Sequence, residues 1–137
     1  EQIYEIQKYT DRLIKVRPHP RCRLDTRLLP NNIEIEKTIR IPSTYDNFDL
    51  NLNCHAVVNY NSGVGINSAI AGTRTIVDHS SLANPVSINI SDIESPYTID
   101  REQWLVEICH TEYTVDELRR GLWINRIAPA LELTAVV

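Results

Sequence analysis

Residues 56–78 read AVVNYNSGVGINSAIAGTRTIVD, and this stretch decides the fold that the sequence predicts. Apolar, largely β-branched runs at 56–60 and 75–78 predict two buried strands. The segment between them predicts a short helix over about 64–71 that ends at Gly72. A helix that joins two buried strands favours a βαβ crossover, in which the strands are parallel. We therefore expect an α/β fold with a parallel sheet flanked by helices.

The turn that begins this predicted helix is a candidate anion site. The segment from Gly63 to Gly72 has no charged side chain, so we expect the helix to be packed on the sheet or beneath another layer. Its first backbone N–H groups lack partners within the helix and carry the positive end of the helix dipole. Gly63 and Gly65 would let an anion approach the backbone, and Asn61 and Ser62 offer oxygens as caps or ligands. The alternative is that Ser62 only caps the helix and the glycines only turn the chain.

Three side chains outside this turn are also candidates for ligand binding. His19 lies between two prolines, which remove backbone donors and hold its loop extended. Arg17 belongs to a locally basic segment, 17–27, that would attract a phosphate. Asp78 ends the second strand, where a doubly wound fold often keeps an acid for a ribose hydroxyl. A solvated histidine, a solvated arginine and a local cap are the respective alternatives.

The length of the chain favours one globular domain, and its net charge argues against one class of function. The 137 residues suffice for one compact domain with a core, which we assign to residues 1–129, followed by a tail at 130–137. The net charge of −4, from 14 basic and 18 acidic residues, argues against a dedicated nucleic-acid-binding module. Because the chain begins at Glu1 and contains no methionine, we expect it to be a fragment of a longer protein.

The cysteines indicate neither a disulfide framework nor a metal site. Cys22, Cys54 and Cys109 are widely spaced without a CxxC pair, and His55 beside Cys54 has no further ligand at metal spacing. No apolar run approaches the roughly 20 residues of a membrane span, and no signal-peptide pattern opens the sequence. We therefore expect a soluble, cytoplasmic protein with no metal and no membrane span.

Periodicity and capping signals predict the other elements. The expected elements are a helix over 2–12, strands over 13–16 and 33–35, a turn over 28–32, a short helix over 46–54, and a helix over 101–110 capped by Asp100. Thr114 and Glu117 have the spacing of a capping box. The box predicts a last helix whose packing face holds Leu118, Leu122 and Trp123.

Two of these motifs together resemble a known family. Arg17-Pro18-His19-Pro20 follows one predicted strand, and Asn61-Ser62-Gly63-Val64 follows another and leads into AIAGTRTIV at 69–77. The pair resembles the C-terminal, donor-binding half of glycosyltransferases with the two-domain GT-B architecture. It is most similar to the branch that includes capsule-polysaccharide transferases, teichoic-acid transferases and bacterial sialyltransferases.

The later part of the chain extends this resemblance. Segments 81–87, 100–105 and 116–123 are similar to bacteriophage-encoded glycosyltransferase-like proteins. Some proteins of that kind add sugars to hydroxymethylated bases in phage DNA. The resemblance covers most of residues 13–125, through short motifs.

The resemblance implies a Rossmann-like half of a GT-B fold that binds a nucleotide sugar, such as a UDP-sugar, as substrate and without a further cofactor. His19 would contact the donor phosphate or nucleotide. Ser62 and the amides of Gly63 and Val64 would hold phosphate, and Arg17 would help to neutralise it. Such contacts stabilise the charge that develops on the leaving diphosphate.

The resemblance leaves the rest of the reaction open. No catalytic base is identifiable, and an acceptor-binding N-terminal half would have to supply it. The acid-x7-acid pattern of many retaining GT-B enzymes is missing, because the loop after the second strand reads Asp78-His79-Ser80-Ser81. Retention or inversion, the donor sugar and the acceptor, whether DNA or glycan, therefore stay undetermined. If the protein is phage-encoded, its compartment is the host cytoplasm.

Two other functions compete with glycosyl transfer. The segment 63–68 imitates G-x-G-x-x-G, and Asp78 could be the ribose acid of a dinucleotide-binding oxidoreductase domain. The third glycine position is Ser68, however, and Asp78 follows the first glycine more closely than is usual in that motif. The other alternative is a Rossmann-like binding or assembly module without catalysis.

Overall fold

The computed structural model describes residues 2–18, 24–30, 32–36 and 54–129. The chain divides into two compact units, Glu1–Ile99 and Asp100–Val137. The first unit holds α1 (Gln2–Ile6), β1 (Ile14–Val16), η1 (Thr26–Leu28), β2 (Ile33–Ile35), β3 (Ala56–Val58), α2 (Gly63–Ala71), β4 (Arg74–Ile76), η2 (Asn84–Val86) and η3 (Ile90–Asp92). The second holds α3 (Glu102–Thr111), α4 (Val115–Arg119) and α5 (Ile124–Ile127).

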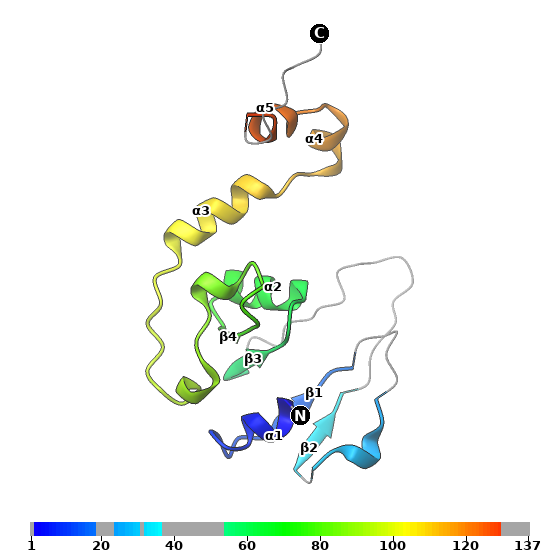
Figure 1. The fold of residues 1–137 in the computed structure, drawn as a ribbon, viewed down its shortest axis with the longest axis vertical. Helices are drawn as coiled ribbons and strands as arrows, with labels where there is room; N and C mark the ends of the chain where they lie inside the picture. The colour runs from blue at the N-terminus through cyan, green and yellow to red at the C-terminus, as the bar shows by residue number, and fades with distance from the viewer. Residues whose placement is uncertain (1, 19–23, 31, 37–53, 130–137) are drawn as a thin grey trace. The chain divides into compact units, whose positions relative to one another are not determined.

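The predicted βαβ crossover is confirmed. β3 and β4 pair in parallel with Ala56 opposite Arg74 and Val58 opposite Ile76, and α2 connects them and packs on both (Figure 1, green). The helix starts at Gly63 and ends at Gly72, whose φ of 87° is left-handed and suits a residue without a Cβ. The second strand begins at Arg74, one residue earlier than expected.

The parallel strands form two pairs. β1 and β2 also run parallel, with Ile14 opposite Ile33 and Val16 opposite Ile35, but they form a sheet of their own. The architecture is therefore mixed α/β, with two small parallel two-stranded sheets and flanking helices. The single parallel sheet that we expected is not seen among the described residues.

A small apolar cluster joins the elements of the first unit. Ile6 of α1, Ile76 of β4 and Ile93 after η3 are buried at its centre. Each such side chain contributes about 1.5–3 kcal/mol when fully buried. The partly buried residues packed around these three are Ile14, Ala56, Val58, Ile88 and Ile90.

α2 packs on β3 and β4, as expected, and its other side is exposed at Asn67, Ile70 and Ala71. The expectation of a helix over 2–12 is wrong, because α1 ends at Ile6. The Thr10 hydroxyl accepts a hydrogen bond from the Arg12 N–H at 3.2 Å, and such local side-chain bonds compete with helix. The helix expected over 46–54 lies outside the described residues except for Cys54, which is not helical.

The second unit confirms the capping box but not one continuous last helix. Thr114 and Glu117 form the complete capping box of α4. The N-cap of α3 is Arg101 and not Asp100 as expected, although the Asp100 carboxylate accepts the Glu102 N–H at 2.9 Å. α4 stops before Gly121, whose φ is 70°, and α5 follows as a separate short helix. The expected packing residues Leu118 and Leu122 are 48% and 40% exposed.

Glycine at position 65 is predicted to be required by packing. A Cβ there would lie 2.9 Å from the Asn59 amide nitrogen and 2.9 Å from a Val77 methyl group, whereas a Cβ at Gly63 would meet nothing within 4 Å. We expect Gly65→Ala to lower the free energy of unfolding by about 1–2 kcal/mol, because overpacking outweighs the better helix propensity of alanine. Gly63→Ala is the matched control, and urea unfolding measures both. Equal stability of the two variants would contradict this account.

Candidate functional site

The loops that leave β3 and β4 meet at the carboxyl edge of this strand pair. The Asp78 N–H donates to the Tyr60 carbonyl at 2.9 Å, which continues the pairing beyond the strands. The Asn61 side chain donates to the Ser80 hydroxyl at 3.2 Å and to its carbonyl at 3.4 Å. The structure thus brings Asn61, Ser62, Gly63, Val64 and Asp78 together at the edge where open α/β folds bind ligands.

Ser62 caps α2, as one reading of the sequence predicted. Its backbone is extended, and its hydroxyl accepts the Val64 N–H at 3.3 Å. Its carbonyl accepts the Gly65 N–H at 2.9 Å. A serine cap of this kind stabilises a helix by about 1 kcal/mol relative to alanine.

One amide of this first turn is left over. The Ser62 N–H donates to the Asn59 side-chain oxygen at 3.2 Å, and the amides of Val64 and Gly65 are bonded to Ser62. The Gly63 N–H has no partner among the described residues, and Gly63 is exposed. This amide can therefore donate to an external acceptor at the positive end of the α2 dipole.

Asp78 adds a carboxylate to the same edge. Its Oδ1 accepts the Ser80 N–H at 3.0 Å and the Ser80 hydroxyl at 2.7 Å, and it lies 3.2 Å from the His79 ring. The Ser80 N–H, the Ser80 hydroxyl and, more weakly, His79 hold the pKa of Asp78 below its ordinary value. An ionised carboxylate can only accept hydrogen bonds, which suits it to sugar or ribose hydroxyls.

The two basic candidates are not both described: Arg17 pairs with a glutamate, and His19 is outside the described residues. Arg17 follows β1 and forms an ion pair with Glu36 at 2.7 Å. Desolvation raises the pKa of the Cys54 thiol, and the positive charge of Arg17 opposes that shift. His19 lies outside the described residues.

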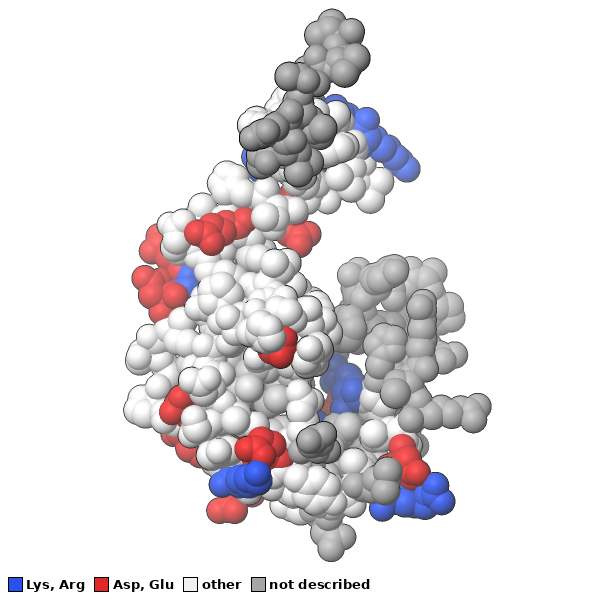
Figure 2. Space-filling model, in the orientation of Figure 1, with Lys and Arg blue, Asp and Glu red and all other residues white. Residues whose placement is uncertain are grey.

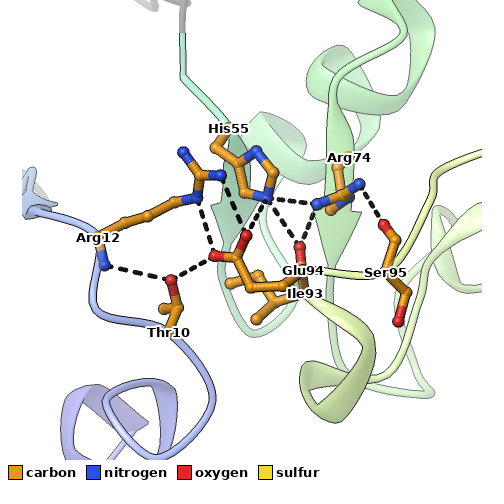
Figure 3. Close-up of polar contacts among 7 residues, drawn as sticks. All are labelled: Thr10, Arg12, His55, Arg74, Ile93, Glu94 and Ser95. Atoms are coloured by element: carbon orange, nitrogen blue, oxygen red, sulfur yellow. Dashed lines mark hydrogen bonds and ion pairs between the residues drawn. The ribbon is translucent and has the colours of Figure 1, made fainter.

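The amino ends of β3 and β4 carry a polar network that we did not predict (Figure 3). Arg74 at the start of β4 is buried, and its guanidinium donates to the carbonyls of Ile93 and Ser95, the latter at 2.7 Å. It also contacts the His55 ring and lies over the Tyr97 ring at 5.4 Å. These contacts hold segment 93–97 against the two strands.

Glu94 extends this network to the N-terminal segment. Arg12 donates to both oxygens of Glu94, at 2.8 and 3.0 Å, and the Thr10 hydroxyl donates to one of them (Figure 3). Arg12 and, next, Thr10 lower the pKa of Glu94 from 4.5 to about 2. The two partners are 82 residues apart in the sequence, so local patterns gave no signal for this pair.

Cavities and charge do not single out the carboxyl edge. A hollow of about 560 Å³ lies beside residues 7–12 and Glu94, and one of about 240 Å³ lies around His55, Arg74 and Tyr97. Ser62 lines neither of these two hollows, and Asn61, Ser62 and Gly63 are exposed. On the face shown in Figure 2, acidic and basic side chains of the described residues are interspersed with uncharged ones.

Other kinds of site find little support in the described part of the chain. Cys54 and Cys109 are free thiols, and no three His, Cys, Asp or Glu side chains described here are grouped as metal ligands. None of the described helices is long and apolar enough to cross a bilayer.

Comparison of the chain with protein-family models, with curated proteins and with solved structures finds no match. The resemblance of the motifs at 17–20 and 61–77 to GT-B glycosyltransferases therefore stays an inference from the sequence.

The network around Glu94 predicts a pH dependence of stability. A carboxylate with a lowered pKa stabilises the fold fully above its unfolded value of 4.5, and this contribution is lost as the pH falls toward about 2. We expect Glu94→Gln to lower the thermal midpoint at pH 6, and the difference from wild type to shrink toward pH 2. Glu34→Gln, which removes an exposed pair with Lys15 at 3.4 Å, is the control with the smaller effect. A difference that stays constant with pH would contradict the assignment.

Proposed function

We propose that this chain supplies the donor-binding half of a nucleotide-sugar-dependent glycosyltransferase of GT-B type. One observation carries the proposal. The exposed first turn of α2 lies at the carboxyl edge of a parallel strand pair, and its Gly63 amide has no partner among the described residues. This arrangement suits the diphosphate of an activated sugar, because both the free amide and the helix dipole favour a negative charge there.

The same turn suits the chemistry of glycosyl transfer. As the bond from the anomeric carbon to the diphosphate breaks, negative charge builds up on the leaving phosphate oxygens. The Ser62 hydroxyl can donate a hydrogen bond while it accepts one from the Val64 N–H. This hydroxyl and the Gly63 amide would therefore bind the transition state, with its charged leaving group, more strongly than they bind the ground state. A single preorganised donor of this kind is worth about 3 kcal/mol in acyl-transfer enzymes.

The neighbouring side chains suit the rest of a nucleotide sugar. The Asp78 carboxylate would accept hydrogen bonds from ribose or sugar hydroxyls, and Asn61 holds the loop of Asp78 close to the turn through Ser80. His19 and Arg17 would assist at the phosphate in the arrangement that the family resemblance implies. The ion pair of Arg17 with Glu36 at 2.7 Å weighs against its part in that arrangement.

The proposal leaves acceptor binding and proton abstraction to another part of the enzyme. Asn61, Ser62 and Gly63 are exposed, as expected of a donor half that closes only against a second domain. The acceptor would be a hydroxymethylated base of phage DNA or a polysaccharide. No base for its hydroxyl is assigned among the described residues.

The two competing functions predict different results in ligand titrations. A dinucleotide-binding domain would bind NADH more tightly than UDP or CMP, and an assembly module would bind none of them. Isothermal titration of the chain with UDP, CMP and NADH distinguishes the three. UDP or CMP binding with little affinity for NADH is the result that glycosyl transfer requires.

Substitution at Gly63 tests the role of its amide directly. Ser62 has φ −121° and ψ 156°, which a following proline tolerates, and Gly63 is the first helical residue, where proline is favoured. We expect Gly63→Pro to fold like wild type and to weaken UDP binding about tenfold or more, because a hydrogen bond to a charged phosphate is lost. Gly63→Ala keeps the N–H and is the matched control, with UDP affinity close to wild type.

Titration calorimetry measures these affinities, and circular dichroism confirms the fold. If Gly63→Pro binds UDP as tightly as Gly63→Ala, the amide does not hold the phosphate. If the wild type binds neither UDP nor CMP at millimolar concentration, the proposed function is wrong.

A further inference from the structure

The side chain of Asn59 lies directly beneath the first turn of α2. Its Oδ1 accepts the Ser62 N–H at 3.2 Å. Its Nδ2 is buried and has no hydrogen-bond partner among the described residues. Both amide atoms lie close to Gly65, because a Cβ at that residue would be 2.9 Å from Nδ2 and 3.1 Å from Oδ1. Asn59 and Gly65 therefore fit together as a pair under the helix start.

The orientation of this amide follows from its contacts. Exchanging Oδ1 and Nδ2 would set an NH₂ group against the Ser62 N–H, with two donors facing each other. The oxygen must therefore face Ser62, and the NH₂ group lies beside Gly65 at the first turn. The positive end of the amide dipole thus adds to the positive end of the helix.

Packing alone does not explain an asparagine at this position. A buried donor without an acceptor is unfavourable, and an apolar side chain would avoid it. Asn59 accepts a hydrogen bond from the Ser62 N–H, and Ser62 accepts those from the N–H groups of Val64 and Gly65. Three of the four backbone amides at the helix start are therefore bonded. Gly63 is then the amide of this turn that remains for a ligand.

We propose that Asn59 is a positioning residue of the phosphate site, which leaves Gly63 as the donor and adds positive potential beneath the phosphate. This inference rests on the proposed function. Asn59 acts through the Ser62 turn and does not touch the ligand. The ligand is the pyrophosphate end of a nucleoside diphosphate, and the nucleoside lies beyond the reach of Asn59.

Two substitutions at Asn59 separate its two contributions. Asn59→Asp keeps the acceptor for the Ser62 N–H but replaces the NH₂ group by negative charge. Asn59→Ala removes the acceptor without adding charge. Asn67→Asp is the matched control, because Asn67 is an exposed asparagine of α2, one turn after Gly63.

The full chain is titrated with UDP by calorimetry and with uridine by NMR, and thermal unfolding is recorded for each variant. We expect UDP to bind Asn59→Asp at least about tenfold and Asn59→Ala at least about threefold more weakly than wild type. Asn67→Asp should stay within about twofold. Uridine binding should change less than about twofold in every variant, because a merely structural defect would weaken uridine and UDP together.

The other possible results of these titrations distinguish the role of Asn59 from the proposed function. If the wild type binds UDP and both Asn59 variants bind it equally well, or lose UDP and uridine in parallel, Asn59 has no positioning role and the proposed function stands. If Asn59→Asp does not fold, Asn59→Ala decides by the same criteria. If the wild type binds no UDP, the proposed function fails and this inference fails with it.

Discussion

The close packing of α2 on its two strands is the constraint on which the rest of this structure depends. At Gly65 the helix lies so near Asn59 and Val77 that an added methyl group would force one of these side chains to shift. This approach fixes the start of α2 beside the end of β3, because only a few residues connect them. The Asn59 side chain can then reach the Ser62 N–H, and Gly63 is exposed, with no partner for its N–H among the described residues.

The two ends of the β3–β4 pair have different tasks. At the amino end, the buried guanidinium of Arg74 satisfies carbonyls of segment 93–95, and the Glu94 carboxylate joins that segment to Arg12. These contacts tie distant segments to the strands. At the carboxyl edge Asn61, Ser62 and Gly63 are exposed, and the Gly63 N–H has no partner among the described residues. The contacts at the amino end hold the strands in place, and a ligand-binding site is more precise when it is built on such a rigid element.

A βαβ unit by itself does not define a function, since many proteins with this unit bind different ligands. The ligand class is indicated instead by the polar groups that the first turn of α2 leaves unpaired among the described residues. A free amide, a serine hydroxyl and the dipole of an uncharged helix favour an anion. The Asp78 carboxylate beside them favours hydroxyl groups. A phosphorylated sugar or nucleoside presents both kinds of group.

The sequence by itself determined the elements whose signals are local. The apolar runs around residues 56–58 and 74–76, the Ser62 cap, the Gly72 stop and the Thr114–Glu117 capping box depend on neighbouring residues, and all are present in the structure. Only the tertiary structure decided the separation of the strands into two pairs, the Arg12–Glu94 ion pair and the place of Asn59 under α2. These features depend on contacts between segments that come together only when the chain folds, so no local pattern encodes them.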